Sequence, residues 1–284
     1  MLYVVVPVHN RVAITTRFLD SLGQQNLQDY LLVLVDDGCT DGTVETVAAR
    51  VGPERLMVLR GDGNLWWAGA LQLAYDALKE RPFAVEDAVL IVNDDVRFDN
   101  DFLRAGLGVL QRHPEACIQA IGIDRASGDV DRGAIADLHR LRFRGAGKGE
   151  LPDCLSTRGL MMRASTFVQS GGFRPQRLPH YLSDYEFTLR LHRRGTPLLV
   201  DDSFCAEVDL SLTGLSEARP GGLRQVWRDS LSNRAKFNPK HWSAFALMVC
   251  PPWIGPVHAA RIWIGFGRAL LRALLPHPSP LRDS

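Results

Sequence analysis

The segment Ala88-Val89-Leu90-Ile91-Val92-Asn93-Asp94-Asp95 joins five apolar residues to an amide and two adjacent carboxylates. The apolar part is typical of a buried strand, which places the carboxylates at one edge of a sheet. Unpaired charge is costly there, and a divalent cation, which prefers oxygen ligands, is the obvious partner. A cation that carries phosphates needs only one or two carboxylates from the protein. We therefore predict a metal–diphosphate site; the alternative is a capped turn before residues 99–110.

The same apolar pattern recurs earlier in the chain and alternates there with helical periodicity. The predicted strands cover residues 2–8, 30–35, 56–59 and 88–92, and the predicted helices cover residues 12–22, 43–51 and 68–78. Continuous apolar strands that alternate with helices indicate an α/β fold, a mostly parallel, Rossmann-like sheet with helices on both faces. Such sheets bind ligands at the carboxyl ends of their strands, so we expect the functional site at that edge.

The pattern changes beyond residue 125. Residues 127–149 are rich in Gly, Asp and Arg, a composition that predicts exposed loops or a small hairpin. We then expect a strand over residues 160–163, a helix over 185–194, a strand over 197–200 and a helix over 222–237. The residues from 242 onward differ in composition from the rest and belong to a separate extension.

Length, charge and cysteine content narrow the class of protein. The chain has 284 residues, which suits one large α/β domain with an appendage. Its net charge of +1 gives no reason to expect a nucleic-acid partner. The five cysteines form no Cys-x-x-Cys pair, so neither a zinc cluster nor a disulfide framework is indicated. A reducing, cytoplasmic setting is the simplest expectation, and the first residues lack the basic leader of a signal peptide.

Three further polar clusters follow the first three predicted strands. They comprise Pro7, His9, Asn10 and Arg11; Asp36 and Asp37; and Asn64, Trp66, Trp67 and Gly69. We expect the polar groups of the first cluster to line a nucleotide pocket. We expect the second cluster to contact the nucleoside, because a carboxylate accepts the imide N–H of uracil or thymine or bonds a ribose hydroxyl. Small residues in the third cluster let the backbone approach a ligand, and its tryptophans would wall a sugar pocket. The ordinary alternatives are helix caps at Asn10, Asp41 or Thr43 and tryptophans packed in the core.

A fifth cluster, Ser183-Asp184-Tyr185-Glu186, begins the predicted helix over residues 185–194. Asp184 is a candidate general base near the ligand site. Its alternative role is to cap that helix or to interact with the helix dipole. Glu186 falls on a different face of the helix, so the two acids need not act together.

In order and spacing, these clusters resemble those of a family 2 glycosyltransferase with the GT-A fold. The matching pieces are Val6-Pro7-Val8-His9-Asn10, Val35-Asp36-Asp37-Gly38, Asn64, Asn93-Asp94-Asp95, Gly159-Leu160-Met161-Met162-Arg163, Gly171-Gly172-Phe173, and Asp184-Tyr185-Glu186-Phe187 with Arg190 and Gly195. The resemblance covers residues 1–215 and is closest to bacterial enzymes of cell-surface polysaccharide synthesis, including rhamnosyltransferases. It implies a catalytic domain over 1–215, with a nucleotide-sugar-binding half at 1–125 and an acceptor-binding half at 126–215.

The resemblance also implies a role for each matching residue. Asp37 would read the pyrimidine base, Asp94 would lie near the ribose, and Asp95 would bind Mn²⁺ or Mg²⁺. Asp184 would be the catalytic base of an inverting transfer, because it would take the proton of the acceptor hydroxyl. The metal would stabilise the leaving diphosphate as a Lewis acid. The acceptor would meet the residues Gly159, Leu160 and Ser183.

The sequence departs from the family pattern at three positions. Ser183 stands where Glu often precedes the base, and Arg174-Pro175 follows Phe173 in place of Asp-Glu. Glu207-Val208-Asp209 occupies the stretch in which many members carry a metal-binding histidine. We expect Asp209 to supply an oxygen ligand in its place.

The extension over residues 216–284 is expected to be helical. Residues 242–257 carry no charge but are interrupted by Pro251, Pro252 and Pro256, so a clean membrane-spanning helix is not expected. Five residues then recur at three- and four-residue spacing, which places them on one helix face: His258, Arg261, Gly265, Arg268 and Arg272. A basic stripe on an apolar helix suits an anionic membrane surface. We therefore expect residues 242–275 to contact the inner face of the cell membrane. The alternative is packing on the catalytic domain or on a second copy in a homodimer.

The leading hypothesis is a metal-dependent transfer of a sugar from a UDP or dTDP donor to a glycan or lipid-linked acceptor. A sugar-phosphate nucleotidyltransferase is the second hypothesis, although the first loop lacks the glycine-rich, basic sequence of that class. A dehydrogenase is disfavoured because no Gly-x-Gly-x-x-Gly follows a strand. A non-catalytic nucleotide-sugar-binding protein is the third, since fold does not determine function. The paired tryptophans favour a deoxysugar such as rhamnose.

Overall fold

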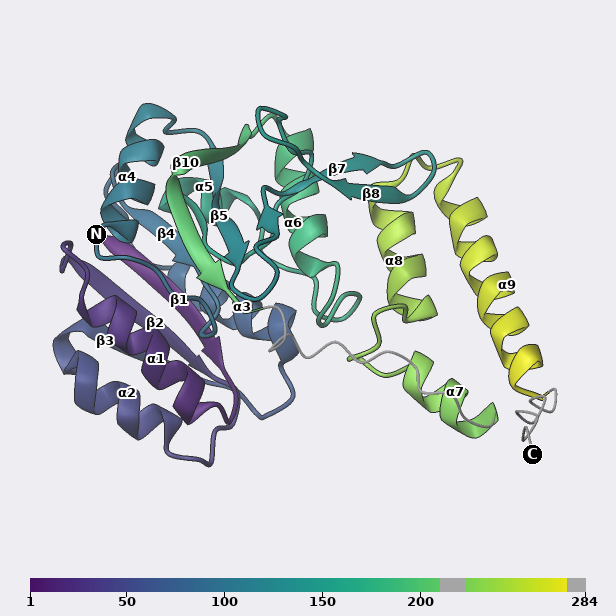
Figure 1. Ribbon diagram of the computed structural model, residues 1–284, viewed down its shortest axis with the longest axis horizontal. Helices are drawn as coiled ribbons and strands as arrows, with labels where there is room; N and C mark the ends of the chain where they lie inside the picture. Colours follow the sequence, from purple (N-terminus) through teal and green to yellow (C-terminus); the bar gives the residue numbers. More distant parts are fainter. Residues whose placement is uncertain (210–222, 275–284) are drawn as a thin grey trace, which may run out of the picture. The chain divides into compact units, whose positions relative to one another are not determined.

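The computed structural model describes residues 1–209 and 223–274 (Figure 1). The chain divides into two compact units, Met1–Thr213 and Gly214–Ser284. The boundary expected between residues 215 and 216 lies outside the described residues, and so does Gly222, where a helix was expected to begin.

The first unit is built on one eight-stranded sheet (Figure 1). Along the sheet the strands follow the order β10-β5-β9-β4-β1-β2-β3, and β6 pairs with β5. Their bounds are β1 Leu2–Val8, β2 Tyr30–Asp36, β3 Leu56–Arg60, β4 Ala88–Ile91, β5 Cys117–Asp124, β6 Val130–Asp131, β9 Leu160–Arg163 and β10 Leu198–Val208. The predicted mostly parallel α/β sheet is therefore confirmed.

Only two strands of this sheet run against the others. β1 pairs in parallel with β2 and β4, β2 with β3, and β5 with β10. β9 is antiparallel to both of its neighbours, β4 and β5, and β6 is antiparallel to β5. The carboxyl ends of β1, β2, β3 and β4 therefore meet at one edge, where each is followed by a polar cluster.

Helices cover both faces of the sheet because alternate strand residues point to opposite sides. In β1, Leu2, Val4, Val6 and Val8 belong to one buried cluster, whereas Tyr3 and Val5 belong to the other. The first cluster packs under α1 (Val12–Gly23), α2 (Thr43–Val51) and α4 (Phe102–Arg112); the second packs under α3 (Trp66–Leu78), α5 (Ala164–Gln169) and α6 (Ser183–Arg193). The short helix η1 (Pro53–Arg55) precedes β3.

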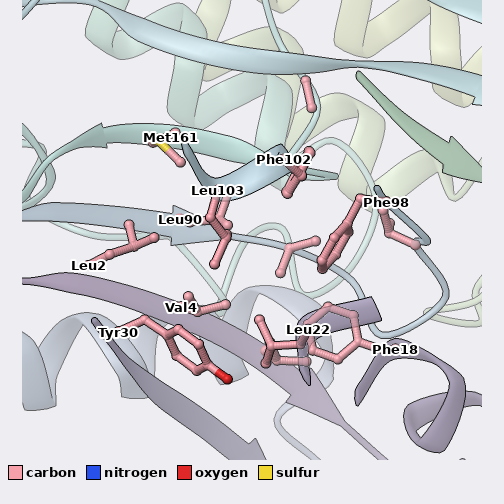
Figure 2. Close-up of a cluster of buried hydrophobic side chains, with 14 of the residues drawn as sticks. Leu2, Val4, Phe18, Leu22, Tyr30, Leu90, Phe98, Phe102, Leu103 and Met161 are labelled. Atoms are coloured by element: carbon pink, nitrogen blue, oxygen red, sulfur yellow. The ribbon is translucent and has the colours of Figure 1, made fainter. Parts of the chain in front are cut away.

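The first cluster continues to the far end of the sheet through stacked aromatic rings. Figure 2 shows Phe18, Phe98 and Phe102 beside Leu22, Leu90 and Leu103. The ring centroid of Phe102 lies 4.4 Å from that of Phe98 and 4.6 Å from that of Phe204. Each such buried side chain stabilises the fold by about 1.5–3 kcal/mol relative to its exposure to water. This packing holds the loops at the carboxyl edge on a rigid base.

The second half of the first unit contains a hairpin, which forms a separate two-stranded sheet, and a strand that is longer than predicted. The hairpin expected within residues 127–149 is present as β7 (Ala134–Asp137) and β8 (Arg142–Gly145). The strand predicted at 197–200 continues as β10 to Val208, and its register with β5 shifts between Val200 and Cys205. The irregularity coincides with the polar residues Asp201, Asp202 and Ser203, which interrupt the apolar pattern.

The described part of the second unit consists of three helices, α7 (Leu223–Ser230), α8 (Pro239–Val249) and α9 (Gly255–Leu274). α7 ends well before residue 237, where the predicted helix ended, and Asn238 instead caps α8 by accepting a hydrogen bond from the Lys240 backbone N–H at 2.9 Å. α9 packs closely on α8, since a Cβ at Gly255 would lie 3.0 Å from the Ala246 carbonyl oxygen. Within residues 1–209 and 223–274, no helix is long and apolar enough to cross a membrane.

His258 does not belong to the basic stripe predicted for α9. Its side chain is buried, whereas the side chains of Arg261, Arg268 and Arg272 are exposed. The predicted exposed stripe is therefore correct for the three arginines. It is wrong for His258, because the first turn of α9 packs against α8 on that side.

Candidate functional site

The loop after β1 is fastened to the loop after β2. Asn10 has a backbone φ of 50° and accepts a hydrogen bond from the Thr40 backbone N–H at 2.8 Å through its side-chain oxygen. Asn is one of the few residues that adopt this left-handed conformation readily. His9 donates from Nδ1 to the Asp37 carbonyl oxygen at 2.5 Å, and Pro7 lies inside β1, opposite Val35. These contacts turn the chain sharply at Asn10 and set the direction of Arg11.

Asp36 and Asp37, the predicted nucleoside contacts, are both buried and both hold loops together. Asp36 accepts a hydrogen bond from the Cys39 backbone N–H at 2.7 Å and pairs with Arg60 at 3.2 Å. The Asp37 carboxylate accepts hydrogen bonds from the backbone N–H groups of Gly63 at 2.9 Å, Leu65 at 3.1 and 3.2 Å, and Trp66 at 3.3 Å. Asp37 therefore organises the start of α3, a role that the sequence analysis did not assign to it.

Glycines after β2 and β3 let these loops and the start of α3 approach one another closely. A Cβ at Gly38 would lie 2.9 Å from the Gly63 Cα, and a Cβ at Gly61 would lie 2.8 Å from the Asp37 Oδ1. At Gly69, a Cβ would lie 3.2 Å from the Leu65 Cβ. Backbone and side chains of the protein itself therefore occupy the space that these glycines leave. Asn64 remains exposed at the tip of the loop.

The two adjacent tryptophans separate and take different positions. Trp66 has an unusual φ of 58°, and its ring centroid lies 5.8 Å from that of His180. Trp67 instead packs against the second buried cluster and donates from Nε1 to the Thr157 hydroxyl at 3.0 Å. Trp66 is therefore the better candidate for a ligand contact, and Trp67 joins α3 to the segment before β9.

The acid pair after β4 meets a cation from the chain itself. Arg11 lies 3.0 Å from Asp94 through Nη1 and 3.2 Å from Asp95 through Nη2. Asp94 also accepts a hydrogen bond from the Thr15 hydroxyl at 2.9 Å. Burial raises the pKa of Asp94 to about 6, although Arg11 and the Thr15 hydroxyl act in the opposite direction. The two carboxylates that were expected to bind a metal are therefore paired with the guanidinium of Arg11.

A small cavity lies beside this pair. It has a volume of about 50 Å³ and is lined by Ile14, Arg17, Phe18, Asp94, Asp95, Val96, Arg97, Arg125 and Asp209. Asp95 and Asp209 both line this cavity. Its three arginines make it suitable for an anion as well. A role of Asp209 as metal ligand stays a prediction.

The oxygen atoms here fit a divalent cation that brings phosphate groups with it. Asn93, Asp94 and Asp95 offer only oxygen donors, the kind that Mg²⁺ and Mn²⁺ prefer. The Asn93 Oδ1 is buried and has no hydrogen-bond partner among the described residues. In residues 1–209 and 223–274, no three side chains of His, Cys, Asp or Glu gather into a metal-binding group. The site therefore suits a cation that takes its other ligands from a diphosphate, and does not suit a cation held by protein alone.

Asp184 begins α6 under conditions that favour its neutral form. The preceding Leu182 has a φ of 68°, and Ser183 is fastened by a hydrogen bond from its hydroxyl to the His180 carbonyl oxygen at 2.7 Å. Burial raises the pKa of Asp184; Asp131 raises it further, whereas a hydrogen bond from the Tyr185 backbone N–H and the charge of Arg158 lower it. A carboxylate with a raised pKa is suited to accept a proton.

Glu186 does not share this environment. Its carboxylate pairs with Arg190 at 2.8 Å, and Arg190 also donates to the carbonyl oxygens of Ser170 and Gly172. This network fixes α6 against the turn at 170–172. The expectation that the two acids of this helix need not act together agrees with their different partners.

Of the expected acceptor contacts, Leu160 lies in the sheet and Gly159 lies in the turn just before β9. Leu160 is fully buried in β9, opposite Ile91 of β4. Gly159 has a φ of 92°, and a Cβ there would lie 2.8 Å from the Ala120 Cβ. Both residues therefore shape the sheet beside the site, and the neighbouring Arg158 is the residue of this segment that influences Asp184. The sequence analysis overlooked Arg158 and Asp131 because neither belongs to a motif.

Comparison with known proteins gives the context of these residues. The sequence model described as "Glycosyl transferase family 2" matches residues 3–167. No curated protein matches the sequence. Among solved structures, S. aureus TarS 1-349 in complex with UDP-GlcNAc has a TM-score of 0.62 at 15% identity, over 96% of this chain and 90% of that chain.

Two further structures are similar at the same level. The mannosyltransferase PcManGT from Pyrobaculum calidifontis, in complex with GDP-Man and Mn²⁺, has a TM-score of 0.56 at 17% identity, over 94% of this chain and 75% of that chain. GalNAc-T7 with UDP, GalNAc and Mn²⁺ has a TM-score of 0.57 at 12% identity, over 76% of this chain and 45% of that chain. The chain thus spans less than half of the length of GalNAc-T7. At these identities the likeness shows the fold alone, which is the GT-A fold.

Proposed function

Because this chain belongs to glycosyl transferase family 2, we propose that it transfers a hexose or deoxyhexose from a UDP or dTDP donor to an acceptor hydroxyl. The transfer inverts the configuration at the anomeric carbon. The acceptor is a glycan or a lipid-linked precursor of a cell-surface polysaccharide. Solved structures of the same fold hold UDP, GDP-Man or UDP-GlcNAc, which supports a nucleotide-diphosphate donor.

The environment of Asp184 is the observation that carries this proposal. Its carboxylate accepts a hydrogen bond from the Tyr185 backbone N–H at 3.0 Å, and the preceding Ser183 is bonded to the His180 carbonyl oxygen. Burial raises its pKa, so the carboxylate gains from taking up a proton. In the proposed reaction, Asp184 takes the proton of the acceptor hydroxyl while the oxygen bonds to the anomeric carbon and the diphosphate leaves. General base assistance of this kind is worth about 10²–10⁴-fold in rate.

The donor occupies the edge formed by the loops after β1, β2, β3 and β4. We assign the diphosphate to the acid pair and its cavity, where Arg17, Arg97 and Arg125 supply positive charge. Asp95 and Asp209 are the proposed ligands of Mn²⁺ or Mg²⁺. When bound, the cation would act as a Lewis acid that stabilises the leaving diphosphate. Trp66, beside His180, is the proposed wall of the sugar pocket.

The second unit is the proposed contact with an anionic membrane surface. Residues 223–274 carry eight Lys or Arg side chains and one acidic side chain, Asp229. Large apolar side chains are exposed among them: Trp253 is 73% exposed and Leu271 is 64% exposed. Exposed aromatic and aliphatic side chains beside basic ones suit the lipid interface. A lipid-linked acceptor would explain such contact.

The exchange Asp184→Asn tests the proposed function. We expect release of UDP or dTDP from a panel of UDP and dTDP sugars, assayed with Mn²⁺ and glycan or lipid-linked acceptors, to fall about 10²–10⁴-fold. Binding of UDP, measured by thermal shift, should be unchanged. The matched control is Asp76→Asn on the exposed side of α3, which should keep full activity. Undiminished turnover of the Asp184→Asn variant would rule out Asp184 as the base.

The same variant should also be more stable than the wild type at neutral pH. The pKa of Asp184 is higher in the folded state than in the unfolded chain, so burial of its charge disfavours folding above the folded pKa. Below the unfolded pKa both states are protonated, and this difference disappears. The gain in thermal stability should therefore be present at pH 8 and absent in strong acid. A loss of stability at pH 8 would show that the charge is compensated.

A further inference from the structure

Arg11 places one guanidinium group across two carboxylates that are almost completely buried. The side chains of Asp94 and Asp95 are 2% and 6% exposed, whereas that of Arg11 is 30% exposed. The two nitrogen atoms Nη1 and Nη2 each take a different carboxylate. The guanidinium therefore bridges the acid pair from its solvent side, where a ligand would arrive.

The backbone directs Arg11 to this position. Asn10 is turned by its left-handed backbone and is held to Thr40. Arg11 then begins α1 by accepting hydrogen bonds from the backbone N–H groups of Ile14 and Thr15, both at 2.9 Å. The Thr15 hydroxyl, one turn later, bonds the same Asp94 at 2.9 Å. Helix α1 thus delivers two groups to the acid pair, and only the longer one carries a charge.

A divalent cation and this guanidinium compete for the same oxygen atoms. Two buried carboxylates repel each other, and a nearby positive charge relieves that repulsion. A metal ion at the pair would stand within a few ångströms of the Arg11 charge, where like charges repel strongly in a poorly solvated site. Metal binding therefore requires Arg11 to leave. A guanidinium that leaves can bind phosphate oxygens through two parallel hydrogen bonds.

We propose that Arg11 is a placeholder cation: it neutralises Asp94 and Asp95 in the free protein and releases this pair to the metal–nucleotide complex when a nucleoside diphosphate arrives to receive its guanidinium. This inference rests on the proposed function, since it uses the metal and the donor assigned there. It makes Arg11 a positioning residue that couples the two ligands. The metal alone binds weakly, because its binding leaves the guanidinium of Arg11 without a partner. The metal raises the affinity for the nucleotide by the same factor by which the nucleotide raises the affinity for the metal.

Mn²⁺ titrations of the full chain test this coupling, with free Mn²⁺ measured by electron paramagnetic resonance and with UDP absent or present. In the wild type, UDP should tighten Mn²⁺ binding at least tenfold. In Arg11→Gln, Mn²⁺ should bind at least tenfold more tightly than in the wild type when UDP is absent, and UDP should add little. The matched control is Arg81→Gln, which removes the same charge from an exposed position outside this cavity; it should keep the wild-type coupling.

Thermal unfolding gives a second measurement on the same proteins. Arg11→Gln should have a lower Tm than the wild type without metal, and Mn²⁺ should restore more of it than it adds to the wild type. If Arg11→Gln does not fold without metal, Arg11→Lys takes its place, because it keeps the charge but lacks the planar fork of two nitrogen atoms that meets the two carboxylates; it should lie between the other two in Mn²⁺ affinity. Equal or weaker Mn²⁺ binding without UDP in the Arg11 variants than in the wild type overturns the placeholder role.

The outcomes separate this inference from the proposed function. If UDP tightens Mn²⁺ binding equally in the wild type and in Arg11→Gln, the metal–nucleotide site stands and the role of Arg11 falls. If neither protein binds Mn²⁺ or UDP, the donor site itself is refuted, and the placeholder role falls with it.

Discussion

Trp67 donates its indole N–H to the Thr157 hydroxyl at 3.0 Å, across 90 positions of the sequence. The bond joins the first turn of α3, which follows the third loop of the site, to the segment that enters β9. Thr157 is buried, so this contact is shielded from water. The next residue along the chain is Arg158, whose charge acts on Asp184. Two parts of the site are therefore connected through Trp67.

The charges around Asp184 predict opposite shifts in the pH dependence of transfer. Arg158 lowers the pKa of Asp184, and Asp131 raises it. Arg158→Gln should therefore leave the base protonated up to a higher pH and move the acidic limb of the pH–rate profile upward. Asp131→Asn should move the same limb downward. Profiles of kcat against pH for the three proteins check this, and shifts of the same sign in both variants would contradict it.

The carboxylate of Asp37 predicts a cost in stability. In Asp37→Asn, an amide nitrogen would face the backbone N–H groups that now donate to Oδ2, so at least one donor would be left without an acceptor. We expect a loss of about 1–3 kcal/mol in the free energy of unfolding, measured by urea denaturation.

Asp62→Asn is the control for this prediction, because Asp62 lies in the same loop, is exposed, and accepts one backbone hydrogen bond, from Asn64. It should change the free energy of unfolding by no more than about 0.5 kcal/mol. Equal stabilities of the two variants would mean that the loop does not depend on Asp37.

Gly159 predicts a steric requirement that can be separated from its backbone conformation. Gly159→Ala should lose about 3 kcal/mol of stability, from a left-handed backbone and a clash with the Ala120 Cβ. Gly128 also has a positive φ, of 75°, but a Cβ there meets nothing within 4 Å. Gly128→Ala should therefore lose only about 1–2 kcal/mol. Thermal or urea unfolding of the two variants measures the difference, and equal losses would exclude the clash.

The basic residues of α9 predict salt-sensitive binding to anionic lipid. Each exposed Arg near such a surface contributes about 1 kcal/mol, so the triple variant of Arg261, Arg268 and Arg272 to Gln should bind vesicles about 100-fold more weakly. Co-sedimentation with phosphatidylglycerol vesicles measures this, with phosphatidylcholine vesicles as the uncharged comparison. Replacement of Arg17, Arg142 and Arg177 by Gln makes the same change of charge in the first unit and should leave binding unchanged. Equal binding of both triple variants would refute the lipid contact.

Much of the first unit could be predicted from the sequence because its elements are continuous in pattern. The bounds of β1, α2 and β9 agree with the predicted ranges, since each is uniformly apolar or uniformly periodic. β10 was predicted at less than half of its length, because Asp201, Asp202 and Ser203 break the apolar run where the strand itself is irregular. Pattern alone cannot distinguish a bulged strand from a strand that ends.

The site was predictable in its location and less so in its contacts. All four loops were expected at one edge, because the carboxyl ends of parallel strands meet there. What each side chain touches depends on distances between loops, and no local pattern contains these. Asp37, which was expected to read a base, also accepts backbone hydrogen bonds, and the acid pair that was expected to bind a metal also pairs with Arg11; no local pattern indicated either contact.

The position of β9 determines when the sheet can be completed during synthesis of the chain. β5 has no pairing with β4; β9 lies between them and pairs with both. A ribosome that has made the first 150 residues has therefore released two pieces of sheet whose inner edges are open, and open edges invite pairing with other chains. The expected halves 1–125 and 126–215 cannot mature one after the other, because four residues of the later one, Leu160–Arg163, complete the centre of the earlier one.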